Sequence, residues 1–272
     1  MKRHNEHSNV ILIKGAGEKA SAVAYRLRQS GFRKIVMTDL PAPLAERRPV
    51  SFCEALIDGQ KEVCGVISQK AEPSMASINH LWAEGKIPII VDPESKILQL
   101  VKPDIFIDGV MAKRNTGTTI KDAPLVIALG PGFVAGKDVH FILETNPASP
   151  YLGRVISEGQ AEEDTGEPTS VLGLTTERLL RSPADGKLFS FKRIGDEVAK
   201  DETIGYVNSS QVKAQVSGCV WGLVRDGIIL KKGQKIGDID PRGKREICFV
   251  IAAEARRIAD GVLEGIVRST IY

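Results

Sequence analysis

Apolar positions near the start of the chain predict a strand, a helix and a second strand. The run Val10–Lys14 is mostly apolar and β-branched and leads into Gly15-Ala16-Gly17, a pattern typical of a buried parallel strand that enters a tight turn. From Glu18–Ser30 apolar residues recur at helical spacing, and Gly31 provides a helix stop. The run Lys34–Asp39 then predicts a second strand with an acid at its end. The pattern therefore indicates a βαβ unit.

The same alternation continues to about the middle of the chain. Helices are expected over residues 75–84 and 95–101, and strands over 88–91, 104–107 and 125–129. Strands that alternate with helices favour an α/β fold, here an N-terminal Rossmann-like doubly wound parallel sheet over residues 1–150. In such sheets ligands bind beyond the carboxyl ends of the strands. The loops that follow the strands are therefore the places where a site is expected.

The second half of the chain has a different pattern. Residues 151–182 read as a glycine-bearing, acidic connector, and residues 186–207 align without a gap to residues 218–239. This repeat of short β-type segments predicts a C-terminal all-β barrel-sandwich module, biotinyl/lipoyl-like, over residues 183–243. No lysine stands at the expected hairpin tip near residues 208–211, which argues against a prosthetic-group carrier. An apolar stripe predicts a terminal helix within residues 244–272.

The glycine turn and the acid after the second strand are candidate ligand-binding residues. Glycines let a backbone approach a pyrophosphate, whose charge is favoured by the amides at a helix start. The turn residues proposed as contacts are Gly15, Ala16, Gly17, Glu18 and Lys19. Asp39 follows at the distance where a carboxylate accepts ribose hydroxyls. The alternative is a tight turn without a ligand, with Asp39 as a solvated loop acid.

Two later loops add candidates. One carries an acid, two cations and side-chain donors that suit an anion: Asp108, Lys113, Arg114, Asn115 and Thr116. The other has Gly130 and Gly132 and is followed by His140, a group that titrates near neutral pH. The alternatives are a solvated polar loop, glycines that only shape the chain, and a structural histidine.

Composition narrows the class of protein. An apolar fraction of 42% and a charged fraction of 26% are those of a globular chain, and 37 basic against 34 acidic residues disfavour a nucleic-acid partner. The four cysteines lack C-x-x-C spacing, so we expect reduced thiols and no metal site. Without a signal-like or membrane-spanning apolar run, we expect a soluble, cytoplasmic protein that does not contact a membrane and that forms a homo-oligomer or a monomer.

Several segments together resemble one known family, the selenium-dependent molybdenum hydroxylase system proteins of YqeB type, with a looser similarity to XdhC-type maturation factors. The segments are Ile13-Lys14-Gly15-Ala16-Gly17, Met37-Thr38-Asp39-Leu40-Pro41, Arg47-Arg48-Pro49-Val50-Ser51-Phe52, Ala128-Leu129-Gly130-Pro131-Gly132-Phe133 and Lys235-Ile236-Gly237-Asp238-Ile239-Asp240-Pro241-Arg242-Gly243. The resemblance implies an accessory role in molybdenum cofactor maturation, with a molybdenum hydroxylase apoenzyme as partner. The chain departs from the family after Glu144-Thr145-Asn146, where Pro147–Tyr151 replace a more basic segment.

Three functions follow as hypotheses. The leading one is a maturation protein, with no catalytic residue assigned, that binds a dinucleotide-like or molybdopterin ligand at the Gly15–Gly17 turn. The second is an NAD(P)-dependent oxidoreductase in which His140 acts as acid or base. The third is a non-catalytic scaffold. NAD(P) and molybdopterin dinucleotide are accordingly the cofactors expected, and Cys53 as a sulfur carrier is a weaker alternative.

Overall fold

The computed structural model describes residues 8–269 and divides into two compact units. Unit 1 contains the described residues up to Pro43, together with Val50–Thr165 and the chain from Ile251 onward. Unit 2 contains Leu44–Pro49 and Gly166–Val250. The sequence placed boundaries after residues 150, 182 and 243, whereas the chain crosses between the units after residues 43, 49, 165 and 250.

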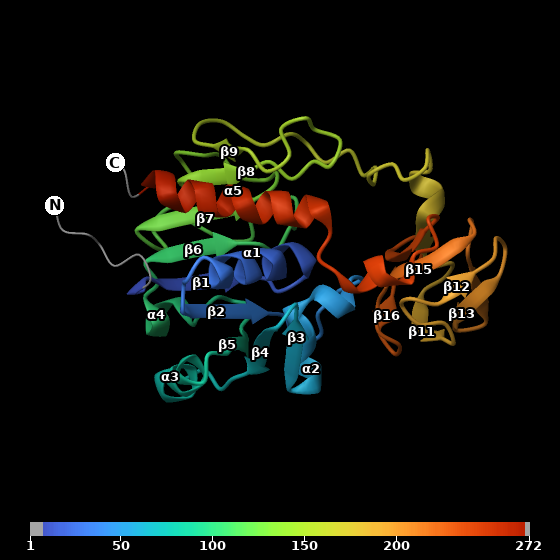
Figure 1. Ribbon diagram of the computed structural model, residues 1–272, viewed down its shortest axis with the longest axis horizontal. Coiled ribbons are helices and arrows are strands. Elements are labelled where there is room, and N and C mark those ends of the chain that lie inside the picture. The colour runs from blue at the N-terminus through green and yellow to red at the C-terminus, as the bar shows by residue number, and fades with distance from the viewer. Residues whose placement is uncertain (1–7, 270–272) are drawn as a thin grey trace. The chain divides into compact units, whose positions relative to one another are not determined.

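Unit 1 is built on a nine-stranded sheet with the order β3-β4-β5-β2-β1-β6-β7-β8-β9 (Figure 1). Neighbouring strands from β4 to β8 are parallel, while β3 and β9 pair antiparallel with β4 and β8. The strands are β1 (Val10–Lys14), β2 (Lys34–Asp39), β3 (Gln60–Val63), β4 (Val66–Lys70), β5 (Ile87–Val91), β6 (Ile105–Asp108), β7 (Leu125–Leu129), β8 (Phe141–Leu143) and β9 (Val155–Ile156). The carboxyl ends of the parallel strands therefore share one edge.

Helices cover the sheet because alternate strand residues are buried on its two faces. On one face Leu12, Val36 and Phe106 pack with Ile78 and Leu81. The helices of unit 1 are α1 (Glu18–Gln29), α2 (Ala55–Asp58), α3 (Met75–Ala83), α4 (Leu98–Val101) and α5 (Ala253–Ser269), with 3-10 turns η2 (Arg48–Val50) at the unit boundary and η3 (Phe52–Glu54). Figure 1 shows α1 and α5 side by side across the sheet, as their many mutual contacts require.

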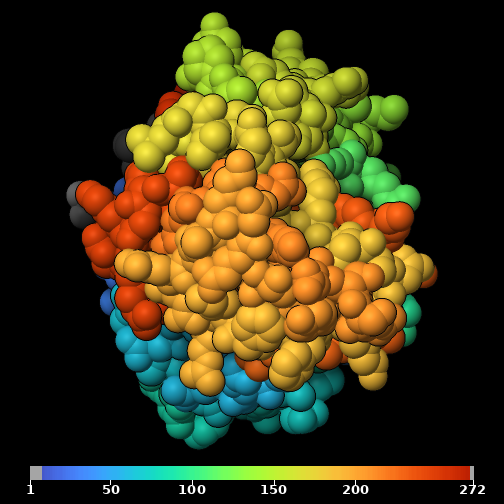
Figure 2. Space-filling model, turned by 90° about the vertical axis from the view of Figure 1, so that its right-hand side faces the viewer, coloured from blue at the N-terminus to red at the C-terminus, as the bar shows by residue number. Residues whose placement is uncertain are grey.

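Unit 2 consists of two four-stranded antiparallel sheets, with the orders β10-β17-β15-β12 and β14-β13-β11-β16. Its strands are β10 (Leu179–Arg181), β11 (Gly186–Ser190), β12 (Glu197–Val198), β13 (Thr203–Val207), β14 (Ser210–Lys213), β15 (Gly218–Leu223), β16 (Ile229–Leu230) and β17 (Lys235–Asp240), with η4 (Thr176–Arg178) and η5 (Arg245–Phe249). Apolar side chains from both sheets form one core. Figure 2 shows the outer surface of this unit, coloured mostly yellow to orange.

The internal repeat in the sequence corresponds to equivalent strands. The first copy supplies β11, β12 and β13, and the second supplies β15, β16 and β17. Gly205 and Gly237 occupy equivalent positions in the two copies, and a side chain would clash at both. A Cβ on Gly205 would lie 2.5 Å from the carbonyl oxygen of Phe189, and one on Gly237 would lie 2.1 Å from the carbonyl oxygen of Gly222. Both copies therefore need a glycine where two strands come closest.

The fold class predicted from the sequence is wrong. The large sheet is mixed rather than a doubly wound parallel Rossmann-like sheet, because antiparallel strands border it on both sides. The C-terminal half forms two curled antiparallel sheets rather than a clear biotinyl/lipoyl-like barrel sandwich. The border strand β3 is mostly polar and turns back through Cys64 and Gly65, both at positive φ, so the search for apolar runs passed over it.

Candidate functional site

The glycine turn after β1 is closed by a neighbouring loop. Gly15 has a φ of +90°, and a Cβ there would lie 3.0 Å from the backbone of Gly109, which follows β6. The amide of Gly15 donates to the carbonyl of Thr38 at 2.8 Å. Glycine is required at this position both for its positive φ and for the close approach. The turn is thus fixed between the ends of β2 and β6.

Asp39 anchors this turn from the end of β2. Its Oδ2 accepts a hydrogen bond from the amide of Ala16 at 2.7 Å, and its Oδ1 accepts one from Leu40 at 2.7 Å. Burial raises the pKa of the Asp39 carboxyl above its ordinary value, and the hydrogen bonds from Leu40 and Ala16 oppose that shift. Both oxygens already bind the main chain, so the carboxylate has a structural role in addition to any contact with a ligand.

The first turn of α1 lies beside the chain that leads into α5. Glu18 accepts a hydrogen bond from the amide of Ala252 at 3.3 Å, and Lys19 forms an ion pair of 3.2 Å with Glu254. Gly17 is the N-cap of α1, and α1 has no side-chain cap. Apart from Gly17 and its two chain neighbours, no heavy atom of the described residues lies within 4 Å of the position that a Cβ on Gly17 would take. This end of α1 is therefore uncapped and open beside Gly17.

The loop after β6 is tied to β1 by a buried polar cluster. Asp108 accepts hydrogen bonds from the hydroxyl of Thr118 at 2.5 Å and the amide of Val110 at 3.2 Å. The ammonium of Lys14 donates to the hydroxyl of Thr116 at 3.0 Å and lies 3.9 Å from Asp108. Lys14 and Thr118 were not among the residues predicted for the site. The signal in the sequence was the position of Lys14 as the last residue of a buried strand.

The remaining candidates in this loop differ in what they contact. The side chain of Asn115 accepts from the amides of Gly117 and Thr118 and shapes the loop. Lys113 forms an ion pair with Asp164. Among the residues that the structure describes, the exposed guanidinium of Arg114 has no hydrogen-bond or ion-pair partner. It is thus the cation of this loop that remains available for another molecule.

The loop after β7 packs against the loop after β6. A Cβ on Gly132 would lie 2.5 Å from the Cα of Arg114, and one on Gly130 would lie 2.5 Å from Oγ1 of Thr145. Both glycines have positive φ. Their observed role is to let the two loops and the end of β8 come together, which places Arg114 at this edge of the sheet.

His140 does not join these residues. It precedes β8, and its Nδ1 accepts a hydrogen bond from the amide of Val126 at 2.9 Å. Val126 belongs to the amino-terminal end of β7, whereas the site candidates follow the carboxyl ends of the strands. Burial lowers the pKa of His140 below its ordinary value. His140 therefore lies toward the opposite edge of the sheet.

The described part of the chain was also compared with the requirements of cysteine chemistry, a metal site and a membrane-spanning helix. Cys53 is buried, and its amide donates to the carbonyl of Ala16 at 3.0 Å, so it packs against the glycine turn. Within residues 8–269 no group of three or more histidine, cysteine or acidic side chains is placed to hold a metal ion. No helix among these residues has the length and apolar character needed to span a membrane.

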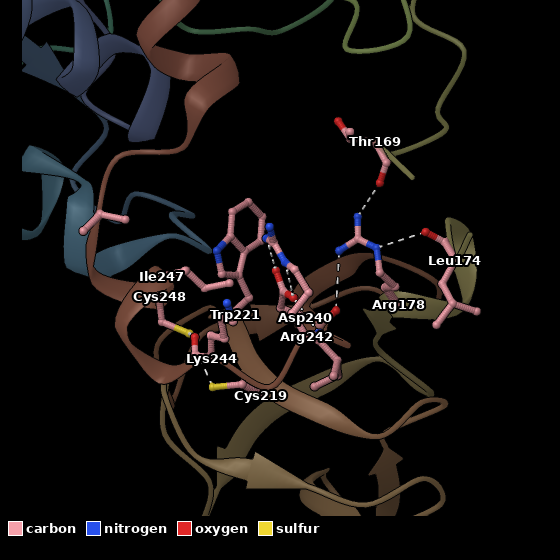
Figure 3. A network of polar contacts seen from close by, with 12 residues as sticks. Thr169, Leu174, Arg178, Cys219, Trp221, Asp240, Arg242, Lys244, Ile247 and Cys248 are labelled. Carbon is pink, nitrogen blue, oxygen red and sulfur yellow. Dashed lines mark hydrogen bonds and ion pairs between the residues drawn. The ribbon is translucent and has the colours of Figure 1, made fainter. Parts of the chain in front are cut away.

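A second set of polar contacts lies in unit 2 (Figure 3). The buried guanidinium of Arg178 donates to the carbonyls of Thr169 and Leu174. Burial acts to raise the pKa of Asp240, but hydrogen bonds from Arg242 outweigh it and leave that pKa below its ordinary value. These contacts join loops to β17 and have the character of structural links.

Comparison with known proteins gives one close sequence relative. No family model matches the chain. The chain is 41% identical over 263 residues to the uncharacterized protein YqeB of Escherichia coli (strain K12). The match covers 97% of this chain and 48% of that protein, so the chain spans about half the length of its relative. The similarity to YqeB expected from the sequence is confirmed.

The solved structures that resemble this chain do so weakly. An aspartoacylase family protein from Mesorhizobium loti has a TM-score of 0.28 at 10% identity, over 85% of this chain and 84% of that one. The ectoine utilization protein EutE from Ruegeria pomeroyi has a TM-score of 0.23 at 9% identity, over 84% and 56%. Scores this low carry no argument about the activity of this protein.

These comparisons do not support the functional description expected from the family resemblance. The solved structures named above are an aspartoacylase family protein and an ectoine utilization protein, and neither name refers to molybdenum cofactor maturation. The comparisons therefore give no support to molybdenum cofactor maturation or selenium dependence as descriptions of this chain, and the sheet topology corrects the Rossmann-like and lipoyl-like descriptions.

Proposed function

We propose that unit 1 binds a small phosphate-bearing ligand at Gly17 and the first turn of α1. The observation that carries the proposal is the uncapped start of this helix, with open space beside Gly17. The first amides of a helix have no partner within it, and they favour an anion because the helix dipole is positive there. A phosphate placed beside Gly17 satisfies these amides.

The charged side chains near the carboxyl ends of the parallel strands support a phosphate-bearing ligand that is bound by one cationic side chain. Lys14, Lys19 and Lys113 each have an acidic partner within 4 Å, whereas Arg114 has none among the described residues. A guanidinium binds phosphate oxygens through two parallel hydrogen bonds. Arg114 is therefore the side chain assigned to the phosphate, and the three lysines mainly hold the loops.

Asp39 limits what else the ligand contacts. Each of its oxygens accepts one main-chain amide, and a carboxylate oxygen has room for a second donor. A ribose hydroxyl bound here would add to the existing hydrogen bonds rather than replace them. NAD(P) and molybdopterin dinucleotide share the pyrophosphate that the α1 amides would recognise. An accessory role beside a molybdenum hydroxylase stays a prediction from the family resemblance.

The site favours binding over turnover. The carboxylates of Asp92, Asp108 and Glu144, at or just after strand ends, accept main-chain amides of the loops that follow them. His140, the acid or base of the oxidoreductase hypothesis, lies toward the other edge. We therefore infer a ligand-binding role without assigning a reaction.

Calorimetric titration of the full chain with NADH, NADPH and inorganic pyrophosphate tests this function. Gly17→Val fills the open space and Arg114→Gln removes the unpartnered cation, and each should weaken binding by about tenfold or more. Arg33→Gln is the matched control, because it removes an exposed cation before the amino end of β2, away from the site. The proposal fails when none of the probes binds or when Gly17→Val and Arg114→Gln bind like Arg33→Gln. Absence of binding would favour the scaffold hypothesis.

A further inference from the structure

Two cysteines that are distant in sequence meet in the core of unit 2. The Sγ atoms of Cys219, on β15, and Cys248, on η5, lie 3.4 Å apart, and both side chains are fully buried (Figure 3). The remaining cysteines, Cys53 and Cys64, belong to unit 1. The sequence analysis treated all four as isolated reduced thiols because the spacing of 29 residues contains no signal of contact.

We propose that Cys219 and Cys248 are a redox modification site that closes reversibly into an intramolecular disulfide. Thiol sulfurs in contact need to move closer by about 1.4 Å to reach a disulfide bond of about 2.0 Å. Cys219 is fixed in the middle of its sheet, where it pairs with Asp240 and Glu197. Cys248 lies on a short 3-10 helix that ends next to the exposed residue Val250, so the adjustment falls to this segment.

The hydrogen bond between the thiols decides which sulfur reacts first. Burial raises the pKa of both thiols, and it raises that of Cys248 to about 12. The hydrogen bond between the two thiols opposes this rise in the pKa of Cys219 and adds to the rise in the pKa of Cys248. Cys219 is therefore the sulfur that loses its proton more readily, and the thiolate is the nucleophile in disulfide exchange.

The oxidant is a small-molecule disulfide that reaches the pair when η5 opens. The thiolate of Cys219 attacks one sulfur of this molecule, the sulfur–sulfur bond breaks, and one small thiolate leaves. Cys248 then gives up its proton and attacks the mixed disulfide at the sulfur of Cys219, which releases the second small thiolate. Two protein thiols are oxidised, one small disulfide is reduced to two thiols, and the two protons pass to the released thiolates.

The Cys219–Cys248 disulfide would link η5 covalently to β15, in a segment that hydrogen bonds from Arg47 already position. The guanidinium of Arg47 donates to the carbonyls of Cys248 and Val250 at 2.8 and 2.9 Å. A disulfide adds a covalent link between β15 and the same segment, and it restricts the unfolded chain between its two ends. Oxidation is therefore expected to stabilise unit 2 without rearranging it.

The test uses the full chain with the Cys64→Ser substitution, which removes the exposed thiol, and glutathione disulfide as the oxidant. After incubation without denaturant, the intact mass should fall by about 2 Da, and dithiothreitol should restore it. Peptide mapping should find Cys219 joined to Cys248. The melting temperature of the oxidised protein should exceed that of the reduced protein by several degrees.

Two further variants make the result decisive. Cys248→Ala and Cys219→Ala should not lose this mass, and a mixed disulfide that gains about 305 Da should accumulate on Cys219 in the Cys248→Ala protein. The proposal is overturned if the folded Cys64→Ser protein keeps the thiols of both Cys219 and Cys248, or carries only unresolved glutathione adducts. A linkage that forms only after denaturation overturns it as well.

Discussion

The main-chain amide of Ala16 donates a 2.7 Å hydrogen bond to Oδ2 of Asp39. This contact joins the turn after β1 to the end of β2. Asp39, which the sequence spacing predicts to bind a ribose, therefore already accepts a hydrogen bond from the glycine turn. The ligand proposed for this edge would therefore meet a preformed backbone rather than a loop that must be ordered on binding.

The Asp39→Asn variant tests the structural role of this carboxylate. An asparagine can present only one oxygen to the two amides, so we expect the free energy of unfolding at neutral pH to fall by about 1 to 2 kcal/mol. Equilibrium urea unfolding of wild type and variant provides the measurement. An unchanged free energy of unfolding would show that the hydrogen bonds from Ala16 and Leu40 contribute nothing net.

The same two proteins should differ in their dependence on pH. Burial raises the pKa of Asp39 above its ordinary value of 3.8. A carboxyl whose pKa is raised by folding holds its proton more tightly in the folded state, so stability is lost as the pH rises from 3.8 through the folded pKa. The advantage of wild type over Asp39→Asn should therefore be larger at about pH 3 than at about pH 7. An advantage that grows with pH would contradict the direction of this shift.

Much of the central sheet could be predicted because its strands are buried on both faces. The strands β1, β2 and β7 begin and end at the residues expected from the apolar runs. The border strand β3 could not be found in this way, because only Val63 in it is buried. Apolar runs reveal strands in a core, and border strands are held mainly by backbone hydrogen bonds that any sequence can make.

The candidate site was predictable only in part. The glycine turn and Asp39 have a local signal, since their spacing follows one strand, one helix and the next strand. The contact between Lys14 and Thr116 joins residues 102 positions apart and exists because β1 and β6 are neighbours. A strand order is not encoded in local spacing. The contacts of Arg47 and the Cys219–Cys248 pair likewise join residues that are distant in sequence, so local spacing contains no signal of them.

Two glycines in α5 offer a matched test of how this helix packs on the sheet. A Cβ on Gly261 would lie 2.0 Å from the carbonyl oxygen of Gly153, whereas on Gly265 the nearest atom would be 3.6 Å away, in Phe141. We expect Gly261→Ala to reduce the free energy of unfolding by about 3 kcal/mol, since backbone must move. Gly265→Ala should be neutral or stabilise by up to about 1 kcal/mol through helix propensity. If the two substitutions change the free energy of unfolding equally, α5 does not pack with Gly261 against the Gly153 backbone as described.

Arg47 should be important for the stability of unit 2. Its guanidinium donates to the carbonyls of Trp221, Cys248 and Val250 and lies 4.0 Å from the centre of the Trp221 ring. Lysine keeps the charge but cannot reach several carbonyls in one plane, so we expect Arg47→Lys to cost about 2 to 4 kcal/mol. Tryptophan fluorescence during urea unfolding, to which Trp221 in unit 2 and Trp82 in unit 1 both contribute, measures this loss. Arg33→Lys is the control and should leave the unfolding curve unchanged, whereas a wild-type curve for Arg47→Lys would contradict the role.

A double-mutant cycle on Lys14 and Asp108 separates structure from ligand binding at the shared edge. Both side chains are almost fully buried, and their charged atoms are 3.9 Å apart. Lys14→Met leaves the Asp108 carboxylate without its cation and should cost about 2 to 4 kcal/mol. Asp108→Asn in the same chain removes the uncompensated charge, so the double variant should recover about 1 to 2 kcal/mol of that loss. Binding of NADH, NADPH or pyrophosphate to the folded double variant should match wild type, because Arg114 rather than Lys14 is assigned to the phosphate. A double variant that folds but has lost binding would transfer that role to Lys14.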